Sequence, residues 1–416
     1  MKLKRLWRVK SMQKKHSFDF DVDIVIVGAG MSGCLLAHAL LMNIPKLNVL
    51  LIDNNPQLIG TTMHPGFDAR SIALSAGSCD ILDALGLWHT LKNKVTHIED
   101  IHIFERGGWG MLDLPRQKDV FGAVVELQVM GKVLADKLKG YAQLTRLYSV
   151  SLTSLEPHRE HIYCHLQNGQ KIRAKLCIGA DGESSVTRQY AGIDTQSIDY
   201  ASSALIANVR CSEEHKNRAF ECFTRSGPIA LLPISDERYA LVWSLKKDAL
   251  EAMEILSDDD FLNMLQKAFG YRAGRFIEVE SRHSYALKLI HSPSPFAHRV
   301  LCIGNAAQSL HPVMGQGFNL GLRDVYQLIT DMTSAYKNGT IGSFTMLNKY
   351  WCLRKKDQNR TVLMTHSVVT LFSSDAWPLV LGRNIALQAM SCFPVLAEPI
   401  VRQARGQFNL FAKENI

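Results

Sequence analysis

Three glycines early in the chain, Gly28, Gly30 and Gly33, have the spacing G-x-G-x-x-G, and an acidic residue, Asp53, lies farther along. Glycines at this spacing form a tight turn and let the backbone approach a pyrophosphate closely. A carboxylate at Asp53 can accept hydrogen bonds from ribose hydroxyls, which favours a ribose without a 2′-phosphate. These residues therefore predict a dinucleotide site that suits FAD or NAD better than NADP.

Two later segments also combine glycine with polar side chains. The stretch GNAAQSLHPVMGQGFNLGLRD, residues 304–324, precedes a helical pattern. It indicates either a tight turn or a site for an anion or polar cofactor at a positive helix N-terminus. Asp181 and Gly182 follow a short apolar run, where Asp-Gly is ordinary turn chemistry or, alternatively, a cofactor contact. No H-E-x-x-H motif is present, His64 and His311 are interpreted as structural, and the sequence identifies no catalytic base and no metal ligand.

The elements that must position these residues follow from the apolar pattern. Around the first glycine motif the pattern predicts a strand at 22–27, a helix at 34–43 and a strand at 47–53. Residues 24–44 carry no formal charge and match a membrane span in length, but the glycines inside them favour a βαβ unit. Helical spacing after Phe318 continues to Asn338, so the 304–324 loop should open a second helix.

Length and composition limit the class of protein. The chain has 416 residues, of which 47% are hydrophobic and 21% charged. This predicts a globular protein with two domains, or one large domain with insertions. Nine cysteines are scattered without a C-x-x-C pair. Their distribution argues against a zinc site or a disulfide framework and favours a reducing compartment, so we expect a cytoplasmic protein.

Both ends of the chain have features that bear on membranes. The first fifteen residues include seven Lys or Arg and no acid, which indicates a solvated basic extension or attraction to anionic lipid on the inner face of the cell membrane. Nucleic acid binding is not expected, because basic residues elsewhere are mixed with acids. The apolar segment 379–401 is interrupted by Gly382, Arg383, Pro394 and Pro399, which favours a packed cap or a lipid-facing helix over a membrane span.

The glycine motifs, taken together, indicate a family. GAGMSG at 28–33, GADGESSVTR at 179–188 and the 304–324 loop resemble, in order and spacing, the flavoprotein aromatic hydroxylases related to p-hydroxybenzoate hydroxylase. The resemblance extends through residues 64–78, 218–233 and 376–387, and within the family it is to the ubiquinone-biosynthesis branch.

The resemblance implies a reaction as well as a fold. It implies an FAD-dependent monooxygenase that uses O₂ and NAD(P)H and acts through a C4a-hydroperoxyflavin. The implied substrate is a polyprenylated phenol of the 2-octaprenyl-6-methoxyphenol type, and other ubiquinone-biosynthesis proteins are implied partners. Hydroxylation at another ring position, or an FAD-binding scaffold without turnover, are the alternatives.

The resemblance also implies roles for individual residues. The pyrophosphate and the adenosine ribose would be held at Gly28, Gly30, Gly33 and Asp53. Arg70 would reach the flavin or its phosphates, and Gln128 the ribityl chain. Asp181 and Gly182 would touch FAD near the path of the nicotinamide donor. The residues implied to lie against the isoalloxazine are Pro312, Gly315, Gly317 and Asn319.

One position departs from the family's pattern. Many members have Gly-Asp where this chain has Gly304-Asn305, so the expected carboxylate contact to the ribityl hydroxyls would come from an amide. An amide can both accept and donate hydrogen bonds, so the substitution weakens one contact without removing the site.

The segment between the second and third glycine motifs predicts a sheet. Its alternating runs at 204–211, 218–224, 227–234 and 238–245 indicate strands of a mixed or antiparallel sheet. Phe220, Phe223, Leu232 and Trp243 on these strands would line a pocket for a prenylated ring or would form the ordinary inner face of the sheet.

The predicted fold is α/β, with a Rossmann-like FAD-binding domain built from discontinuous segments, an inserted β-sheet substrate domain and a helical C-terminal portion. The predicted boundaries are 1–20 for the basic extension, 21–100, 121–195 and 291–345 for the FAD-binding domain, 101–120 and 196–290 for the substrate domain, and 346–416 for the C-terminal portion.

Overall fold

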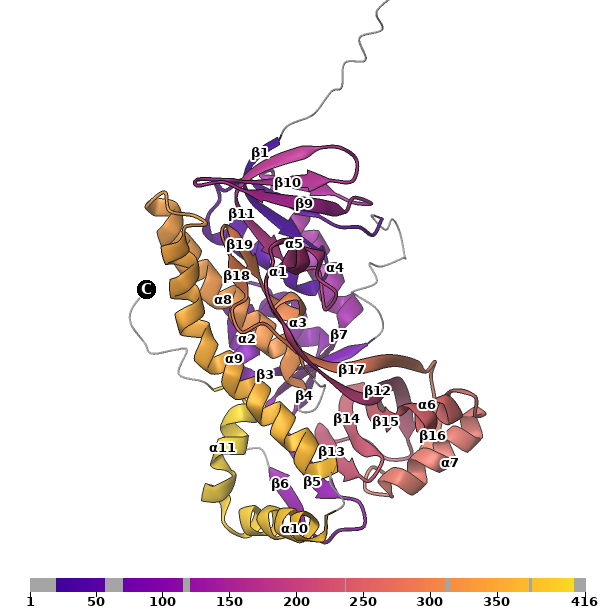
Figure 1. The fold of residues 1–416 in the computed structure, drawn as a ribbon. Helices are drawn as coiled ribbons and strands as arrows, with labels where there is room; N and C mark the ends of the chain where they lie inside the picture. Colours follow the sequence, from indigo (N-terminus) through magenta and orange to yellow (C-terminus); the bar gives the residue numbers. More distant parts are fainter. Residues whose placement is uncertain are drawn as a thin grey trace, which may run out of the picture.

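A computed structural model of the chain describes residues 20–56, 70–114, 120–235, 237–310, 315–373 and 376–407. It consists of three sheets and a set of helices, with the longest helix along one side (Figure 1). The predicted basic extension falls outside the described residues except for its last residue, and so do His64, His311 and Pro312.

The first sheet is largely parallel and contains the first glycine motif. Its main path runs β18-β19-β11-β1-β2-β8, with β10 and β9 added beyond β11. The strands are β1 Phe20–Val27, β2 Val49–Ile52, β8 Leu144–Leu147, β9 Leu152–Pro157, β10 Ile162–Leu166, β11 Lys171–Gly179, β18 Phe296–Ala297 and β19 Val300–Cys302. The central strand β1 pairs in parallel with both β2 and β11, as a doubly wound fold requires.

Both faces of this sheet are covered, which explains the continuous apolar run of β1. Ile24 and Ile26 pack in a cluster with helices α1 (Met31–Asn43), α4 (Leu127–Lys139) and α8 (Gln316–Lys337). Val25 and Val27 belong to a second cluster with β9 and β10. A strand buried on both faces is uniformly apolar, whereas a half-exposed strand alternates.

The second sheet is mixed and lies at the other end of the molecule. Its order is β20-β17-β12-β15-β14-β13-β5-β6, with β16 beside β12. The strands are β5 Asp100–Glu105, β6 Met111–Leu114, β12 Gln196–Cys211, β13 Arg218–Thr224, β14 Gly227–Ser235, β15 Arg238–Lys246, β16 Phe276–Val279, β17 His283–His291 and β20 Gln308–Ser309. The long pair β12 and β17 connects the two ends (Figure 1). Helices α6 (Lys247–Glu254) and α7 (Asp258–Phe269) cover one face of this sheet.

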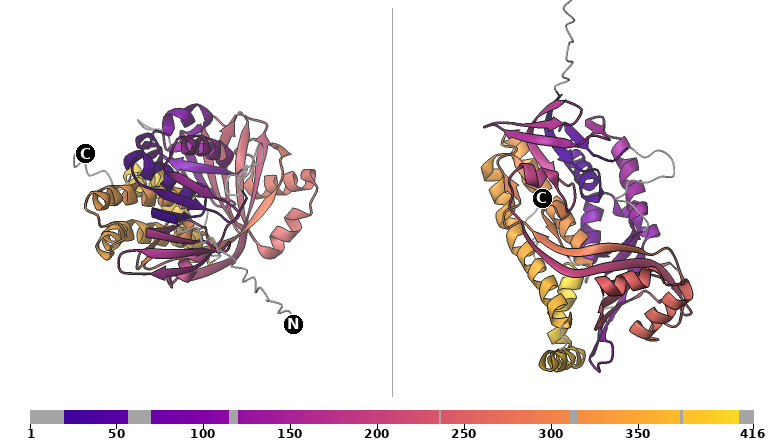
Figure 2. Two further views of the ribbon diagram at one scale, coloured as in Figure 1. Left: turned by 90° about the horizontal axis from the view of Figure 1, so that it is seen from above. Right: turned by 45° about the vertical axis from the view of Figure 1, so that its right-hand side comes forward.

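A small antiparallel sheet and the C-terminal helices lie between and beside the two large sheets. The small sheet consists of β3 Ser71–Ser75, β7 Gly122–Glu126 and β4 Thr96–Ile98, and the short helices α2 Ala76–Ala84 and α3 Trp88–Leu91 lie between β3 and β4 in the chain. A further short helix, α5 Val186–Tyr190, leads from β11 of the first sheet to β12 of the second. The C-terminal helices are α9 Phe344–Ser373, α10 Trp377–Cys392 and α11 Pro394–Ala404. Helix α9 runs the length of the molecule, and α10 turns sharply across its end (Figures 1 and 2).

These observations confirm the predicted fold class and several predicted elements. The strand predicted at 218–224 is β13, and the helix predicted after Phe318 is α8, which begins at Gln316. The uncharged stretch 24–44 is β1 and the buried helix α1, as the βαβ interpretation requires. The division of the chain at the predicted domain boundaries remains a proposal.

A buried charge cluster joins α8 to α9. Arg354 Nε donates to Asp324 Oδ1 at 2.8 Å, and both side chains are fully buried. Gln308, which follows the Gly304 turn, and Gln358 donate to the same carboxylate at 2.8 and 3.0 Å. Burial disfavours the charged guanidinium, but the carboxylates of Asp324 and Asp357 outweigh burial and raise the pKa of Arg354 above its ordinary value. The cluster therefore fixes the end of the 304–310 segment against two helices.

Candidate FAD and substrate site

A cleft of about 670 Å³ lies at the carboxyl ends of the parallel strands. Loops that follow β1, β2, β11 and β19 all contribute to it, which is where open α/β sheets bind their ligands. The predicted site residues that line the cleft are Gly28, Gly30, Asp53, Arg70, Asp181, Gly182, Asn305, Gly315 and Gly317. The fold thus brings together residues from all three glycine motifs.

The first three glycines differ in what they face. Gly28 has φ +102°, and a Cβ there would lie 2.5 Å from the carbonyl oxygen of Ala180. A Cβ on Gly33 would lie 1.8 Å from the carbonyl oxygen of Gly28, so Gly33 lets α1 pack onto the turn. At Gly30, by contrast, no described atom lies within 4 Å of the Cβ position. Packing therefore explains Gly28 and Gly33, while Gly30 borders open space in the cleft.

Asp53 secures the glycine turn to β2. Its Oδ2 accepts a hydrogen bond from the backbone N–H of Ala29 at 2.5 Å, and its Oδ1 accepts one from the N–H of Asn55 at 2.7 Å. The side chain is 5% exposed and borders the cleft. The carboxylate therefore holds the loop in shape, a role that the sequence motif did not indicate, and a ribose contact remains a proposal.

The carboxylate of Asp181 accepts hydrogen bonds from residues at the start of α5. Its Oδ1 accepts from the Ser185 hydroxyl at 2.6 Å, and its Oδ2 accepts from the backbone N–H and the hydroxyl of Thr187, both at 3.0 Å. This arrangement supports the turn interpretation for the carboxylate. Arg188, which the sequence analysis missed, donates to the carbonyl oxygens of Ala306 and Glu183, both at 2.8 Å. It ties the Asp-Gly loop to the Gly304–Ala306 turn.

Two helices direct their N-termini toward the cleft. Gly30 is the N-cap of α1, and Gly315, with φ +60°, is the N-cap of α8. Neither helix has an acidic residue in its first turn, although the carboxylate of Asp53 lies beside the N-terminus of α1 through its hydrogen bond with Ala29. Asn305 is exposed in the short turn between β19 and β20 and borders the same cleft. The arrangement favours an anionic ligand.

Three of the predicted cofactor residues that the structure describes lie outside the cleft lining: Gly33, which packs against the glycine turn, Gln128 and Asn319. Gln128 is exposed at the start of α4, and its amide donates to Glu126 at 2.6 Å. Asn319 is buried: its Oδ1 accepts from the N–H of Ser75 at 2.9 Å, and its Nδ2 donates to the carbonyl oxygens of Ala73 and Gly315 at 2.9 and 2.6 Å. Asn319 therefore fastens α8 to β3, next to the cleft.

A second, apolar cavity of about 290 Å³ adjoins the cleft. The two share the residues Ala73, Leu232, Val242 and Gly315. The cavity lies between the mixed sheet and the C-terminal helices, and Phe223 stacks on Phe372 of α9 with ring centroids 3.6 Å apart. A ligand in the cavity would therefore lie beside a ligand in the cleft.

The predicted substrate residues divide between the two faces of the mixed sheet. Phe223 and Leu232 line the apolar cavity. Phe220 also borders the cavity, but its ring packs on Phe269 of α7, with centroids 5.6 Å apart, in the same cluster as Trp243. Trp243 is 2% exposed and lies on the other face, packed against Phe261 of α7. It belongs to the core, which was the alternative interpretation.

The sequence analysis missed the contribution of the C-terminal helices to this cavity. These residues are Met364, Val368, Leu371, Leu387, Met390 and Ile400. Arg383 of α10 also lines the cavity, and its guanidinium forms an ion pair with the buried Glu105. Apolar positions at helical spacing were the available signal, but that pattern does not say which element a helix covers.

The fold and the paired cavities define an FAD-dependent monooxygenase, in which a glycine-lined dinucleotide cleft adjoins an apolar chamber. The sequence profile of the family described as "FAD binding domain" matches residues 21–356. The chain belongs to this family, in the ubiquinone-biosynthesis branch of the FAD-dependent aromatic hydroxylases.

Individual proteins agree with this assignment. The ubiquinone hydroxylase UbiL of Rhodospirillum rubrum is 31% identical, over 95% of this chain and 92% of that protein. The 3-demethoxyubiquinol 3-hydroxylase of Escherichia coli is 29% identical, over 92% of this chain and 98% of that protein. The p-nitrophenol 4-monooxygenase PnpA of Pseudomonas putida has the same fold, with a TM-score of 0.76 at 16% identity, over 94% of this chain and all of that one.

Proposed function

We propose that this chain hydroxylates the aromatic ring of a polyprenylated phenol in ubiquinone biosynthesis, converting a 2-octaprenyl-6-methoxyphenol to the corresponding 1,4-benzoquinol. The observation that supports this most is the junction of the two cavities at Ala73, Leu232, Val242 and Gly315. A ring held in the apolar cavity would meet the flavin across this junction. The similarity to a 3-demethoxyubiquinol 3-hydroxylase supports a second candidate, hydroxylation at another ring position.

Bound FAD would supply the activation of O₂, with NAD(P)H as the proposed electron donor, and the chain's own residues would position the reactants. We place the direct contacts to FAD at the cleft-lining residues, with Gly30 and Gly182 beside the phosphates and Asn305 beside the ribityl chain. Gly33 and Asn319 would act by shaping the loops. Contacts from Gln128 and Pro312 remain predictions.

The lining of the apolar cavity is suited to excluding water. Apolar side chains from the sheet and from α9, α10 and α11 surround it, so water would be kept away from the junction where the ring would meet the flavin. The neighbouring N-terminus of α8 would stabilise negative charge on the reduced flavin ring. Neither role requires a catalytic base from the protein.

The test uses purified protein with FAD, NADH or NADPH, O₂ and a set of short-chain prenylphenols. The set includes the 6-methoxyphenol, the unsubstituted phenol and the demethoxyquinol, and mass spectrometry with NMR identifies the hydroxylated carbon. We expect a 1,4-quinol from the 6-methoxyphenol. A product only from the demethoxyquinol would establish the second candidate instead. Full FAD occupancy without a product from any substrate would refute both and leave a scaffold.

A further inference from the structure

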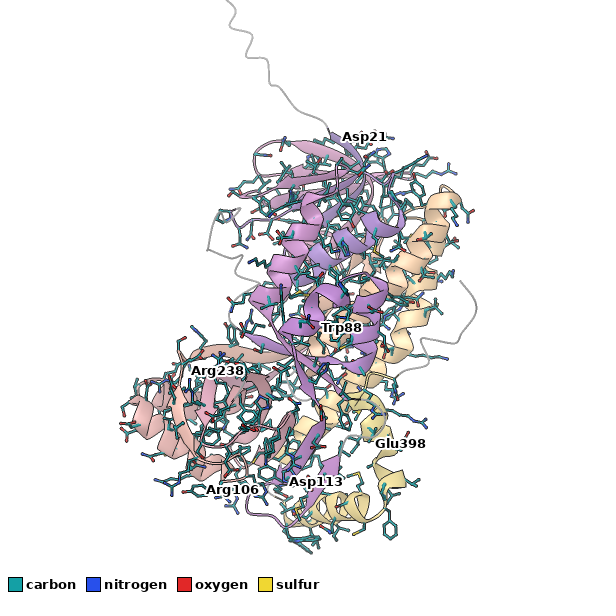
Figure 3. The ribbon with its side chains drawn as sticks, turned by 180° about the vertical axis from the view of Figure 1, so that it is seen from behind. Asp21, Trp88, Arg106, Asp113, Arg238 and Glu398 are labelled. Carbon is teal, nitrogen blue, oxygen red and sulfur yellow. The ribbon has the colours of Figure 1, made fainter. Side chains whose placement is uncertain are left out.

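One end of the molecule presents an apolar surface formed by α10, α11 and the turn between β5 and β6. Large apolar side chains are exposed there: Trp109, Trp377, Ile385, Phe393, Val395 and Leu396. Val395 is 84% exposed and Trp377 is 73% exposed, values unusual for such side chains in a water-facing surface. Arg106, Asp113 and Glu398, labelled in Figure 3, mark this end of the molecule. We call it the apolar end.

The part of the apolar end formed by α10 and the bend before α11 is almost without charge. Between Trp377 and Ala397 the sequence contains one charged residue, Arg383, whereas 21% of the whole chain is charged. Arg383 is 6% exposed and forms an ion pair with Glu105. The outward face of α10 and the bend before α11 therefore expose no charged side chain to solvent.

The turn between β5 and β6 belongs to the same surface. Its Gly110 donates a backbone hydrogen bond to Oδ1 of Asn384 in α10 at 2.6 Å, which places Trp109 beside the helix. A Cβ on Gly108 would lie 2.5 Å from the same amide oxygen, so the turn packs closely on α10. The tryptophan and the helices thus form one continuous surface rather than separate exposed residues.

The inner face of the same helices lines the substrate cavity. Leu387 and Met390 of α10 and Ile400 of α11 border the cavity, while Trp377 and Ile385 face outward. One helix therefore separates the cavity from the apolar end. A cavity of about 290 Å³ is at the small end of ligand sites, so it suits a ring and the start of a prenyl chain and leaves the rest to be housed elsewhere.

The shape of the helix pair suits the surface of a bilayer. Among the described residues no single helix is long and apolar enough to cross a membrane, and α10 and α11, which pass that test together, are bent by 97°. Aromatic residues stand at the start of α10 and at the bend, the positions that aromatic side chains favour at a membrane–water boundary. A helix pair so strongly bent, with few charged side chains, suits a position in the interface better than a crossing of the bilayer.

We propose that the apolar end inserts into the interfacial layer of a lipid bilayer, and that the prenyl chain of the substrate passes from the acyl region beside α10 into the cavity. The second half of this statement rests on the proposed function, because it requires a prenylated substrate. The first half rests on the surface alone. A second copy of the chain is the competing occupant.

The test measures binding to vesicles of phosphatidylcholine, which carries no net charge, at high ionic strength. These conditions suppress any contribution of the basic N-terminal segment. The variant is W377S/F393S/V395S, whose residues lie outside the cavity lining. The matched control is I255S/Y271S, at positions 84% and 70% exposed beside α6 and α7. FAD content of both proteins reports whether the fold is intact.

We expect the control to bind vesicles like the wild type and the triple variant to bind at least about tenfold more weakly. The triple variant should also lose turnover of a long-chain substrate embedded in vesicles while keeping turnover of a short soluble analogue. Equal vesicle binding by all three proteins would overturn the proposal. So would a wild-type dimer that ignores vesicles and dissociates in the triple variant. Lost vesicle binding with no hydroxylation by any protein would refute the proposed function and leave the membrane surface standing.

Discussion

The space beside Gly30 gives the sharpest test of the cofactor site. Its backbone, φ −73° and ψ −168°, is open to alanine, and no described atom lies within 4 Å of the Cβ position. Alanine is a poorer N-cap than glycine by roughly 0.5–1.5 kcal/mol. Alanine also lowers the conformational entropy of the unfolded chain, which stabilises the folded protein by about 0.4–1 kcal/mol. The stability of the Gly30→Ala apoprotein should therefore change by less than about 1 kcal/mol.

Binding of FAD should respond much more strongly. A methyl group placed against the phosphates overpacks the site by about 1–3 kcal/mol, which is roughly a five- to hundredfold rise in Kd. The assay is titration of the apoprotein with FAD, followed by quenching of flavin fluorescence, beside thermal unfolding of the apoprotein. Unchanged FAD affinity in the Gly30→Ala protein would refute the reasoning and remove the first glycine motif from the cofactor contacts.

Two other glycines provide controls for this experiment. Gly382, in α10, also has no described atom within 4 Å of its Cβ position but lies far from the cleft, so Gly382→Ala should leave FAD affinity unchanged. Gly33→Ala should behave in the opposite way. Its Cβ would lie 1.8 Å from a backbone oxygen, so the apoprotein itself should lose stability before any cofactor is added.

Three further outcomes are expected. Asn305→Leu should weaken FAD binding by about 1–3 kcal/mol in the same titration, because a ribityl hydroxyl loses its partner, whereas Asn305→Asp should bind like the wild type; a tight-binding Leu variant would remove Asn305 from the contacts. Arg354→Met leaves the fully buried Asp324 without its cation and should lower the free energy of unfolding in urea by about 3–5 kcal/mol. Arg402→Met removes an exposed ion pair with Glu398 and should lower the free energy of unfolding by under about 1 kcal/mol. Equal losses in the Arg354→Met and Arg402→Met proteins would contradict a stabilising role for the buried cluster. Removing residues 1–11 should leave FAD content unchanged and weaken binding to anionic vesicles at low salt, and equal binding with and without these residues would show the basic segment to be inert.

The sequence by itself determined the local elements of the cofactor site. A β-branched run, three spaced glycines and a helical pattern are contiguous, and each specifies its backbone through the conformational range of its own residues. The same holds for the strand at 218–224 and for the helix predicted after Phe318. These features appear in the structure as predicted because they depend little on distant parts of the chain.

Tertiary structure decided which face of each element meets which partner. In β15 both alternating sets are apolar, Ala240 and Val242 on one face and Leu241 and Trp243 on the other, so the pattern could not indicate which face lines the cavity. Asn319 was expected at the flavin, and its partner Ser75 is 244 residues away in the chain.

The cavity wall and the apolar end arise in the same way. Glu105 and Arg383, which meet behind the cavity, are separated by 278 residues. Apolar periodicity shows that a helix such as α10 has a face to bury, but not what covers that face or how much of it stays exposed. Contacts between residues so far apart depend on how whole sheets and helices pack, and local propensity carries no information about that packing.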